Sequence, residues 1–197
     1  MRLFFACFPP APIRNAIGAF QKELQNAVAD PGVRWTRHEQ FHFTVRFLGE
    51  IAEPVVPRLV EAATRVCTEQ PTFSAALGSL ELLPNSRTPH TLVLGLRIGL
   101  VEMATLARAL DKAFRGLDLG IAPENRPFRA HLTLARMKNP RAAEAVLPLL
   151  QRSWQRLDQI PSFMVESCTL VRSELRPDGP IYTPLAECLL QHSAEKL

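Results

Sequence analysis

The feature that most constrains the fold of this chain is an order of predicted elements that occurs twice. The first half predicts a strand at 3–8, a helix at about 12–29, a strand at about 41–48, a helix at about 54–69 and a strand at about 73–82. The second half predicts a strand at 91–97, a helix with an apolar face from Met103 to Leu117, a strand at 129–136, a helix at about 140–157 and a strand at about 162–172. A repeated unit of this kind is expected to form two similar lobes.

Local signals indicate where these elements begin and end. Apolar residues recur at helical spacing from Ile13 to Val28, and Asp30-Pro31-Gly32 ends that helix. The segment 84–89 separates the halves, and a tight reversal at 176–180 leads into an extra strand at about 181–190. We expect a single bilobal α+β domain over residues 1–197, built from two interleaved repeats at about 1–85 and 90–190. Two pseudo-symmetric lobes of antiparallel sheet, with helices on their outer faces, would enclose a cleft.

Two short strings fall at equivalent positions of this repeat. H-F-T-V (42–45) and H-L-T-L (131–134) both lie on predicted strands, and 131 − 42 gives an offset of 89 residues. Because side chains alternate along a strand, the histidine and threonine of each string share one face, while the apolar residues point into the core. Approximate two-fold symmetry then predicts that four side chains meet across the cleft: His42, Thr44, His131 and Thr133.

Two imidazoles and two hydroxyls suit a phosphodiester hydrolysis that needs no metal. A neutral imidazole can take a proton from attacking water, while an imidazolium gives a proton to the departing ribose oxygen, since imidazole titrates near pH ~6.5. Threonine hydroxyls can donate hydrogen bonds to phosphate oxygens. A 2′,3′-cyclic phosphate fits because its strained ring holds the ester ready for attack. The residues alone leave open which histidine is the acid.

Zinc binding is the rival interpretation of the histidines. It would need a third ligand at characteristic spacing, and the remaining histidines, His38, His90 and His192, stand in dissimilar contexts. We therefore predict neither a metal nor a cofactor.

The two strings also carry a resemblance. H-F-T-V-R-F-L-G (42–49) and H-L-T-L-A-R (131–136) resemble the paired H-x-T-x motifs of the two-histidine phosphoesterase superfamily, closest to its RNA 2′,3′-cyclic phosphodiesterase branch, also called 2′–5′ RNA ligase. Further segments similar to that branch are V-R-W-T (33–36), L-P-N (83–85) and S-E-L-R-P-D-G-P-I-Y (173–182). The resemblance covers nearly the whole chain. It implies the bilobal fold, a 2′-phosphate product, His42 as proton donor and His131 as proton acceptor.

Four further residues are candidates for substrate binding. By the resemblance, Arg136 would contact the nucleotide, although strict alternation places it opposite His131, so it needs a strand end or a bend to reach the cleft. Phe47 takes the equivalent place in the first motif, and Arg46 lies on the predicted face of the first histidine. Trp35 could stack on a base, or it could belong to the core. A basic rim could also come from residues that flank the motif strands: Arg34, Arg37, Arg126 and Arg129.

Composition indicates the class of protein and the compartment in which it works. Hydrophobic residues make up 47% of the chain and charged residues 21%, which is typical of soluble globular proteins. No apolar run approaches the ~20 residues of a membrane helix, and the apolar stretch at the start, Leu3 to Phe8, is shorter than the ~7–15-residue core of a signal peptide. No paired spacing links the four cysteines, which favours free thiols in a reducing cytoplasm: Cys7, Cys67, Cys168 and Cys188.

The sequence therefore predicts a monomeric cytoplasmic hydrolase that opens 2′,3′-cyclic phosphates on RNA 3′ ends or small cyclic nucleotides, with no obligate protein partner and no membrane contact. Two alternatives remain. One is ATP-independent 2′–5′ joining of RNA ends in the same site, and the other is a non-catalytic module that binds RNA ends. Transfer-RNA splicing ends, RNA fragments and 2′–5′-linked oligonucleotides all present the same ester.

Overall fold

The computed structural model of the chain describes residues 1–85, 87–117, 119–151, 155–177 and 179–192. Its strands are β1 (Arg2–Cys7), β2 (Val33–Trp35), β3 (Phe43–Glu50), β4 (Phe73–Leu83), β5 (Thr91–Ile98), β6 (His131–Met137), β7 (Phe163–Val165), β8 (Ser167–Glu174) and β9 (Ile181–Leu189). Its helices are α1 (Ala11–Ala27), α2 (Val56–Thr68), α3 (Leu100–Arg115), α4 (Pro140–Val146) and α5 (Gln155–Asp158), with the 3-10 turns η1 (His38–Gln40), η2 (Glu53–Val55) and η3 (Leu147–Gln151).

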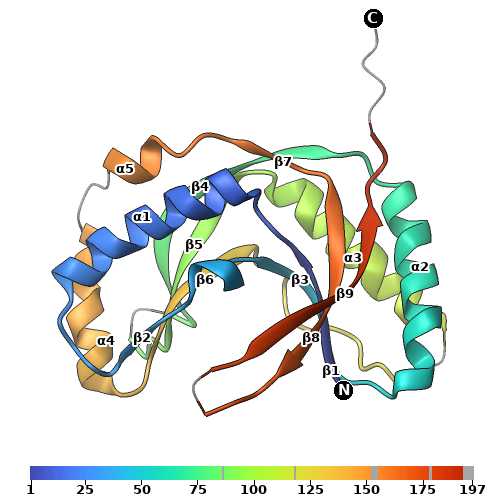
Figure 1. Ribbon diagram of the computed structural model, residues 1–197, viewed down its shortest axis with the longest axis horizontal. Coiled ribbons are helices and arrows are strands. Elements are labelled where there is room, and N and C mark those ends of the chain that lie inside the picture. Colours follow the sequence, from blue (N-terminus) through green and yellow to red (C-terminus); the bar gives the residue numbers. More distant parts are fainter. Residues whose placement is uncertain (86, 118, 152–154, 178, 193–197) are drawn as a thin grey trace, which may run out of the picture.

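All nine strands belong to one strongly curled sheet (Figure 1). The strand order is β7-β4-β5-β6-β3-β1-β8-β9, with β2 paired to β6, and every pairing between these strands is antiparallel. The predicted α+β class is confirmed. The two sheets expected from the sequence are two halves of a single sheet, which join where β3 meets β6. We call these the His42 half (β3, β1, β8, β9) and the His131 half (β6, β5, β4, β7).

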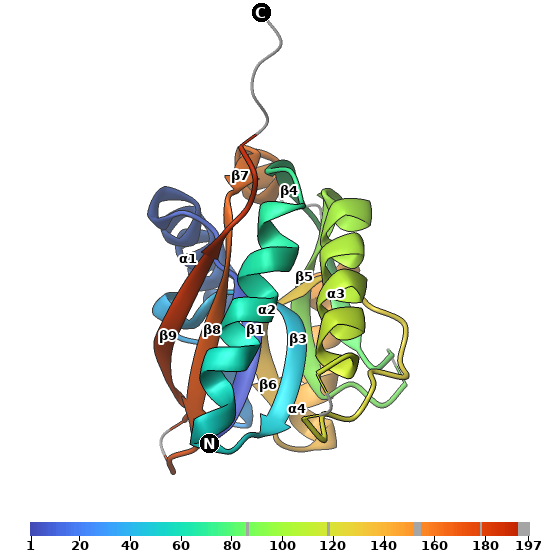
Figure 2. The same ribbon diagram turned by 90° about the vertical axis from the view of Figure 1, so that its right-hand side faces the viewer.

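The two sequence repeats exchange their third strands. In the His42 half, β1 and β3 of the first repeat are extended by β8 of the second. In the His131 half, β5 and β6 of the second repeat are extended by β4 of the first. Helices α2 and α3 lie side by side over the His42 half (Figure 2), whereas α1 and α4 lie on the His131 half. Each half is therefore completed by the other repeat.

Two predicted elements differ from the structure for local reasons. The helix expected at about 140–157 divides into α4, η3 and α5, with 152–154 outside the described residues. Pro148 lies in η3, and a proline lacks the amide N–H that a continuous helix would need there. The strand expected at about 162–172 is two strands, because β7 pairs with β4 while β8 pairs with β1 and β9. In the predicted reversal at 176–180, Asp178 lies outside the described residues.

The main core lies between the sheet and the helices that cover its outer face. Its largest fully buried side chains are phenylalanines, and Phe5 of β1 stacks on Phe114 of α3 with ring centroids 5.3 Å apart. The four cysteines are buried and free. Among the described helices, none is long and apolar enough to cross a membrane. Since helices cover the outer face, the inner face of the curl is left for a site.

Candidate active site

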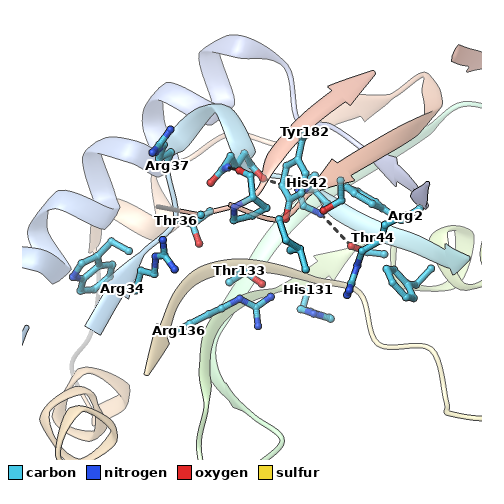
Figure 3. Close-up of a pocket in the computed structure, with 18 residues that line it drawn as sticks. Arg2, Arg34, Thr36, Arg37, His42, Thr44, His131, Thr133, Arg136 and Tyr182 are labelled. Carbon is cyan, nitrogen blue, oxygen red and sulfur yellow. Dashed lines mark hydrogen bonds between the residues drawn. The ribbon is translucent and has the colours of Figure 1, made fainter. Parts of the chain in front are cut away.

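The two motif strands meet at one backbone pair. Phe43 of β3 pairs with Leu132 of β6, and each of these residues directly follows a motif histidine. The antiparallel register places each histidine across from the threonine of the other motif, so His42 and His131 are diagonal neighbours. In a regular antiparallel pair, diagonal neighbours lie about 7–8 Å apart, which is within reach of aromatic and other long side chains. Figure 3 shows both imidazoles in the same pocket.

Both imidazole rings are oriented by the same contact. Nδ1 of His42 lies 2.6 Å from the carbonyl oxygen of Gln40, and Nδ1 of His131 lies 2.8 Å from that of Arg129. Because a carbonyl oxygen only accepts hydrogen bonds, Nδ1 carries the proton in both rings. Nε2 is then the nitrogen available for proton transfer in each motif. In the first motif, Nε2 of His42 lies 3.1 Å from Oγ1 of Thr44.

A bulge follows each H-x-T sequence. The register of β3 on β1 skips Val45, and the register of β6 on β5 skips Leu134. A one-residue bulge reverses the side-chain alternation beyond it. Phe47 and Arg136, which are 136 − 47 = 89 residues apart, therefore turn toward the cleft, and both line it. The bulge in β6 is therefore the bend that allows the side chain of Arg136 to reach the cleft.

The same reversal makes the prediction for Arg46 wrong. This side chain is 6% exposed and does not line the cleft. Beyond the bulge it points to the outer side of the sheet, where it forms an ion pair with Asp111 of α3 at 2.8 Å. It also donates hydrogen bonds to the carbonyl oxygens of Phe47 and Ala122 at 2.6 and 2.5 Å. Arg46 therefore connects β3, α3 and the segment before β6.

The cleft has a volume of about 510 Å³ and is strongly basic. Four arginines line it, and no carboxylate is found among the described residues of its wall: Arg2, Arg34, Arg37 and Arg136. The remaining arginines of the predicted rim lie elsewhere, since Arg126 pairs with Glu124 and Arg129 pairs with Glu81. An anion is therefore the expected ligand of the cleft.

Two further tests bear on the class of this site. Among the residues that the structure describes, no group of three or more His, Cys, Asp or Glu side chains is arranged to hold a metal ion. The family model for LigT-like phosphoesterases matches residues 8–93 and 101–182. The chain belongs to the LigT-like phosphoesterase family.

Named relatives of this LigT-like chain extend over nearly its full length. It is 32% identical over 203 residues to an RNA 2′,3′-cyclic phosphodiesterase of Thermus thermophilus, covering 100% of the chain and 94% of the relative. It is also 32% identical over 193 residues to the RNA 2′,3′-cyclic phosphodiesterase of Escherichia coli, covering 93% of each.

Solved structures show the same architecture. TT0787 of Thermus thermophilus superimposes with a TM-score of 0.79 at 28% identity, covering 98% of this chain and 100% of that one. Escherichia coli LigT complexed with 3′-AMP superimposes with a TM-score of 0.72 at 27% identity, covering 96% and 97%.

Several residues of the LigT-like cleft escaped the sequence analysis. Arg2 lies at the start of β1, with its guanidinium carbon 4.9 Å from the centroid of the Phe47 ring. Gln40 and Tyr182 also line the cleft, from η1 and β9. The alternation of β1 puts Arg2 and Phe4 on one face. That signal becomes informative only when β1 is known to lie beside β3.

His42 is the more enclosed of the two imidazoles. Its ring centroid lies 5.0 Å from that of Phe4, 5.7 Å from that of Phe8 and 5.3 Å from that of Tyr182, which meets it edge-on. Burial lowers the pKa of His42 to about 4, against the opposing effect of the Gln40 carbonyl and with a smaller contribution from the charges of His131 and Arg136. In the free protein His42 is therefore neutral at pH 7.

Proposed function

We propose that this chain hydrolyses 2′,3′-cyclic phosphates on RNA 3′ ends and small cyclic nucleotides to 2′-phosphates, without a metal ion. The observation that carries the proposal is the pair of Nε2 atoms directed into one cleft, with four arginines around them. The names of the Thermus thermophilus and Escherichia coli relatives support the substrate class.

The proposed reaction is an in-line displacement with two proton transfers. Nε2 of His131 takes a proton from water as the water oxygen attacks phosphorus. Nε2 of His42 gives its proton to the 3′ oxygen as the bond between that oxygen and phosphorus breaks. The hydrogen bonds from both Nδ1 atoms to backbone carbonyls hold the rings in the tautomer that this requires.

The low pKa of His42 must be reconciled with its role as the donor. In the free protein the ring is neutral, because burial lowers its pKa to about 4. A cyclic phosphate in the cleft places a negative charge beside the ring and raises this pKa, so that substrate binding and protonation favour each other. As its bond to phosphorus breaks, the leaving 3′ oxygen gains negative charge and becomes more basic than Nε2 of His42, which favours transfer of the proton to that oxygen.

Neighbouring side chains would bind the rest of the substrate. Thr44 and Thr133 are placed to donate hydrogen bonds to the non-bridging phosphate oxygens. Arg136 would pair with phosphate or stack on a base, and Phe47 and Trp35 would provide further stacking surfaces.

We also propose that the chain works as a single bilobal domain, as a monomer, in the cytoplasm. The exchanged third strands support one domain, because each half of the sheet is incomplete without the other repeat. Four buried free cysteines support a reducing compartment.

The decisive experiment is hydrolysis of an oligonucleotide with a terminal 2′,3′-cyclic phosphate in excess EDTA, with the product identified by phosphorus NMR. We expect a 2′-phosphate from the parent protein, and a loss of about 10²–10⁴-fold in kcat for His42→Ala and for His131→Ala. His90→Ala is the matched control, since that histidine is exposed and lies outside the cleft. Activity that returns only with added zinc would overturn the metal-free mechanism.

A further inference from the structure

A second hollow adjoins the catalytic cleft. It has a volume of about 610 Å³ and lies between α1 and the segment that runs from β2 into η1. We call it the α1 hollow. Its lining on the helix side is Asn15, Gly18, Gln21, Lys22 and Gln25. Trp35, Thr36 and Arg37 line both spaces, so residues 35–37 form a ridge that the α1 hollow and the cleft share.

The chemistry of the α1 hollow suits a single nucleic-acid strand. Lys22 and Arg37 supply positive charge, and the carboxylate of Glu39 is paired with His38 at 3.1 Å. Trp35 places an aromatic ring on the ridge. Proteins that bind single strands combine a basic groove for the backbone with aromatic side chains on which bases stack.

Backbone pairing of β2 with β6 and one buried side chain together fix the ridge to the catalytic strand. Gln21 of α1 donates from Nε2 to the carbonyl oxygens of Thr36 and Leu134, each at 2.9 Å. Leu134 is the bulged residue of β6, directly after the H-L-T of the second motif. The α1 hollow is therefore held in a defined position relative to His131.

The absence of a side chain at Gly18 keeps this hollow open, and tight packing does not require a glycine at this position. Glycine in a helix interior weakens the helix relative to alanine. A Cβ atom added at Gly18 would contact only the Cβ of His38, at an ordinary distance of 3.6 Å, among the residues described. The backbone could accept a side chain, and that side chain would enter the space between α1 and η1. The missing side chain therefore contributes room for a ligand.

We propose that the α1 hollow binds the nucleotide on the 5′ side of the one that carries the cyclic phosphate. The RNA chain crosses the ridge, its phosphate lies between Arg37 and Lys22, and its base stacks on Trp35. The enzyme then prefers oligonucleotide ends to cyclic mononucleotides. This inference rests on the proposed function, because it takes the cyclic end to be held between His42 and His131.

The test compares a 2′,3′-cyclic mononucleotide with a trinucleotide that ends in the same cyclic phosphate. We expect the parent protein to show a KM about tenfold lower for the trinucleotide. Lys22→Glu should raise the trinucleotide KM by about tenfold. It should also reduce the slope of log KM against the logarithm of salt concentration by about 0.7, the value for one phosphate contact on a single strand. The mononucleotide should be hydrolysed as by the parent protein.

Two further variants make the result specific. Lys112→Glu makes the same charge change at an exposed position of α3 and should leave both KM values unchanged. Gly18→Gln should raise the trinucleotide KM as Lys22→Glu does, without lowering the melting temperature, because glutamine is the better helix former. Equal KM values for both substrates in the parent protein, or equal effects of Lys22→Glu and Lys112→Glu, would overturn the inference while the proposed function stands.

Failure of the proposed function has a different signature. If neither substrate is hydrolysed, binding of a labelled trinucleotide that ends in a 2′-phosphate is measured by fluorescence anisotropy. Weaker binding by Lys22→Glu than by Lys112→Glu would then support the α1 hollow as an RNA site in a protein without this activity. Equal binding by the two variants would remove both proposals.

Discussion

Phe43 and Leu132 face each other at the junction of the two sheet halves, and each fixes the strand position of the histidine before it. Their pairing is the contact through which β3 and β6 form one sheet. The separation of the two imidazoles therefore depends on how this buried pair packs.

Phe43→Leu tests that dependence. We expect a loss of about 1–1.5 kcal/mol in the free energy of unfolding, and a loss of about tenfold in kcat, because small displacements of catalytic groups are costly. Phe114→Leu, also fully buried but in α3, is the control and should lose similar stability at unchanged kcat. Equal kcat losses in the two variants would argue against a specific role for the junction.

The titration of His42 should respond to phosphate. In the free protein its ring should titrate near pH 4 by NMR, because burial disfavours the imidazolium. Addition of a nucleoside 2′-phosphate should raise this pKa, whereas the nucleoside without phosphate should not. An unchanged pKa with the phosphate bound would contradict the proposed role of His42 as proton donor.

The same group predicts acid sensitivity of the fold. The pKa of His42 is about 4 when folded and near ~6.5 when unfolded, so the unfolded chain binds this proton first as pH falls. Stability should be unaffected by His42 above pH ~6.5, and should decrease between pH ~6.5 and ~4 by up to about 3 kcal/mol. Denaturant unfolding across this range should show a smaller decrease for His42→Gln. His90→Gln, which removes an exposed histidine outside the cleft and retains His42, is the control for the loss of one imidazole.

Arg46 should matter for stability and little for the substrate. Arg46→Ala removes one partner of the buried Asp111, which keeps Arg115 and the N–H of Glu124, so the cost should lie below the roughly 3–5 kcal/mol of an uncompensated buried charge and above that of an exposed pair. The exposed pair of Arg65 and Glu61 is the reference, and Arg65→Ala should cost less than about 1 kcal/mol. At a temperature where the variant is folded, its KM should stay within about twofold of the parent value. A raised KM at full stability would return Arg46 to the binding site.

The residues that follow the two bulges should act on binding. Phe47→Ala and Arg136→Ala should each raise KM by about tenfold, since each removes a surface of the cleft that we propose contacts the nucleotide. Val101→Ala is a suitable control, because it is an exposed apolar residue of α3 outside the cleft. KM values unchanged in all three variants would place the nucleotide elsewhere.

Much of this fold could be predicted from local patterns. Helical spacing from Ile13 to Val28 predicted α1, and the repeated H-x-T strings predicted both motif strands, because periodicity reports directly on which face is buried. The three-residue strand β2 was missed, since a segment this short carries no period of its own.

The order of the strands in the sheet and the positions of the bulges could not be predicted from local sequence patterns. Alternation predicts the same face for Arg46 and His42, and only the skipped residue Val45 in the register with β1 reverses it. For the same reason sequence reasoning could place Phe47 and Arg136 as equivalents, yet it needed the tertiary pairing to direct them into the cleft.

The exchange of third strands has a consequence for synthesis of the chain. The sheet half that carries His42 begins at Arg2, but it gains β8 and β9 only from residues 167–189, which leave the ribosome after the other strands described here. During translation β1 therefore lacks its partner β8, and β3 lacks its partner β6, until those later strands have been synthesised. Because β4 and β8 are exchanged, neither half of the sheet is complete until both repeats have been translated.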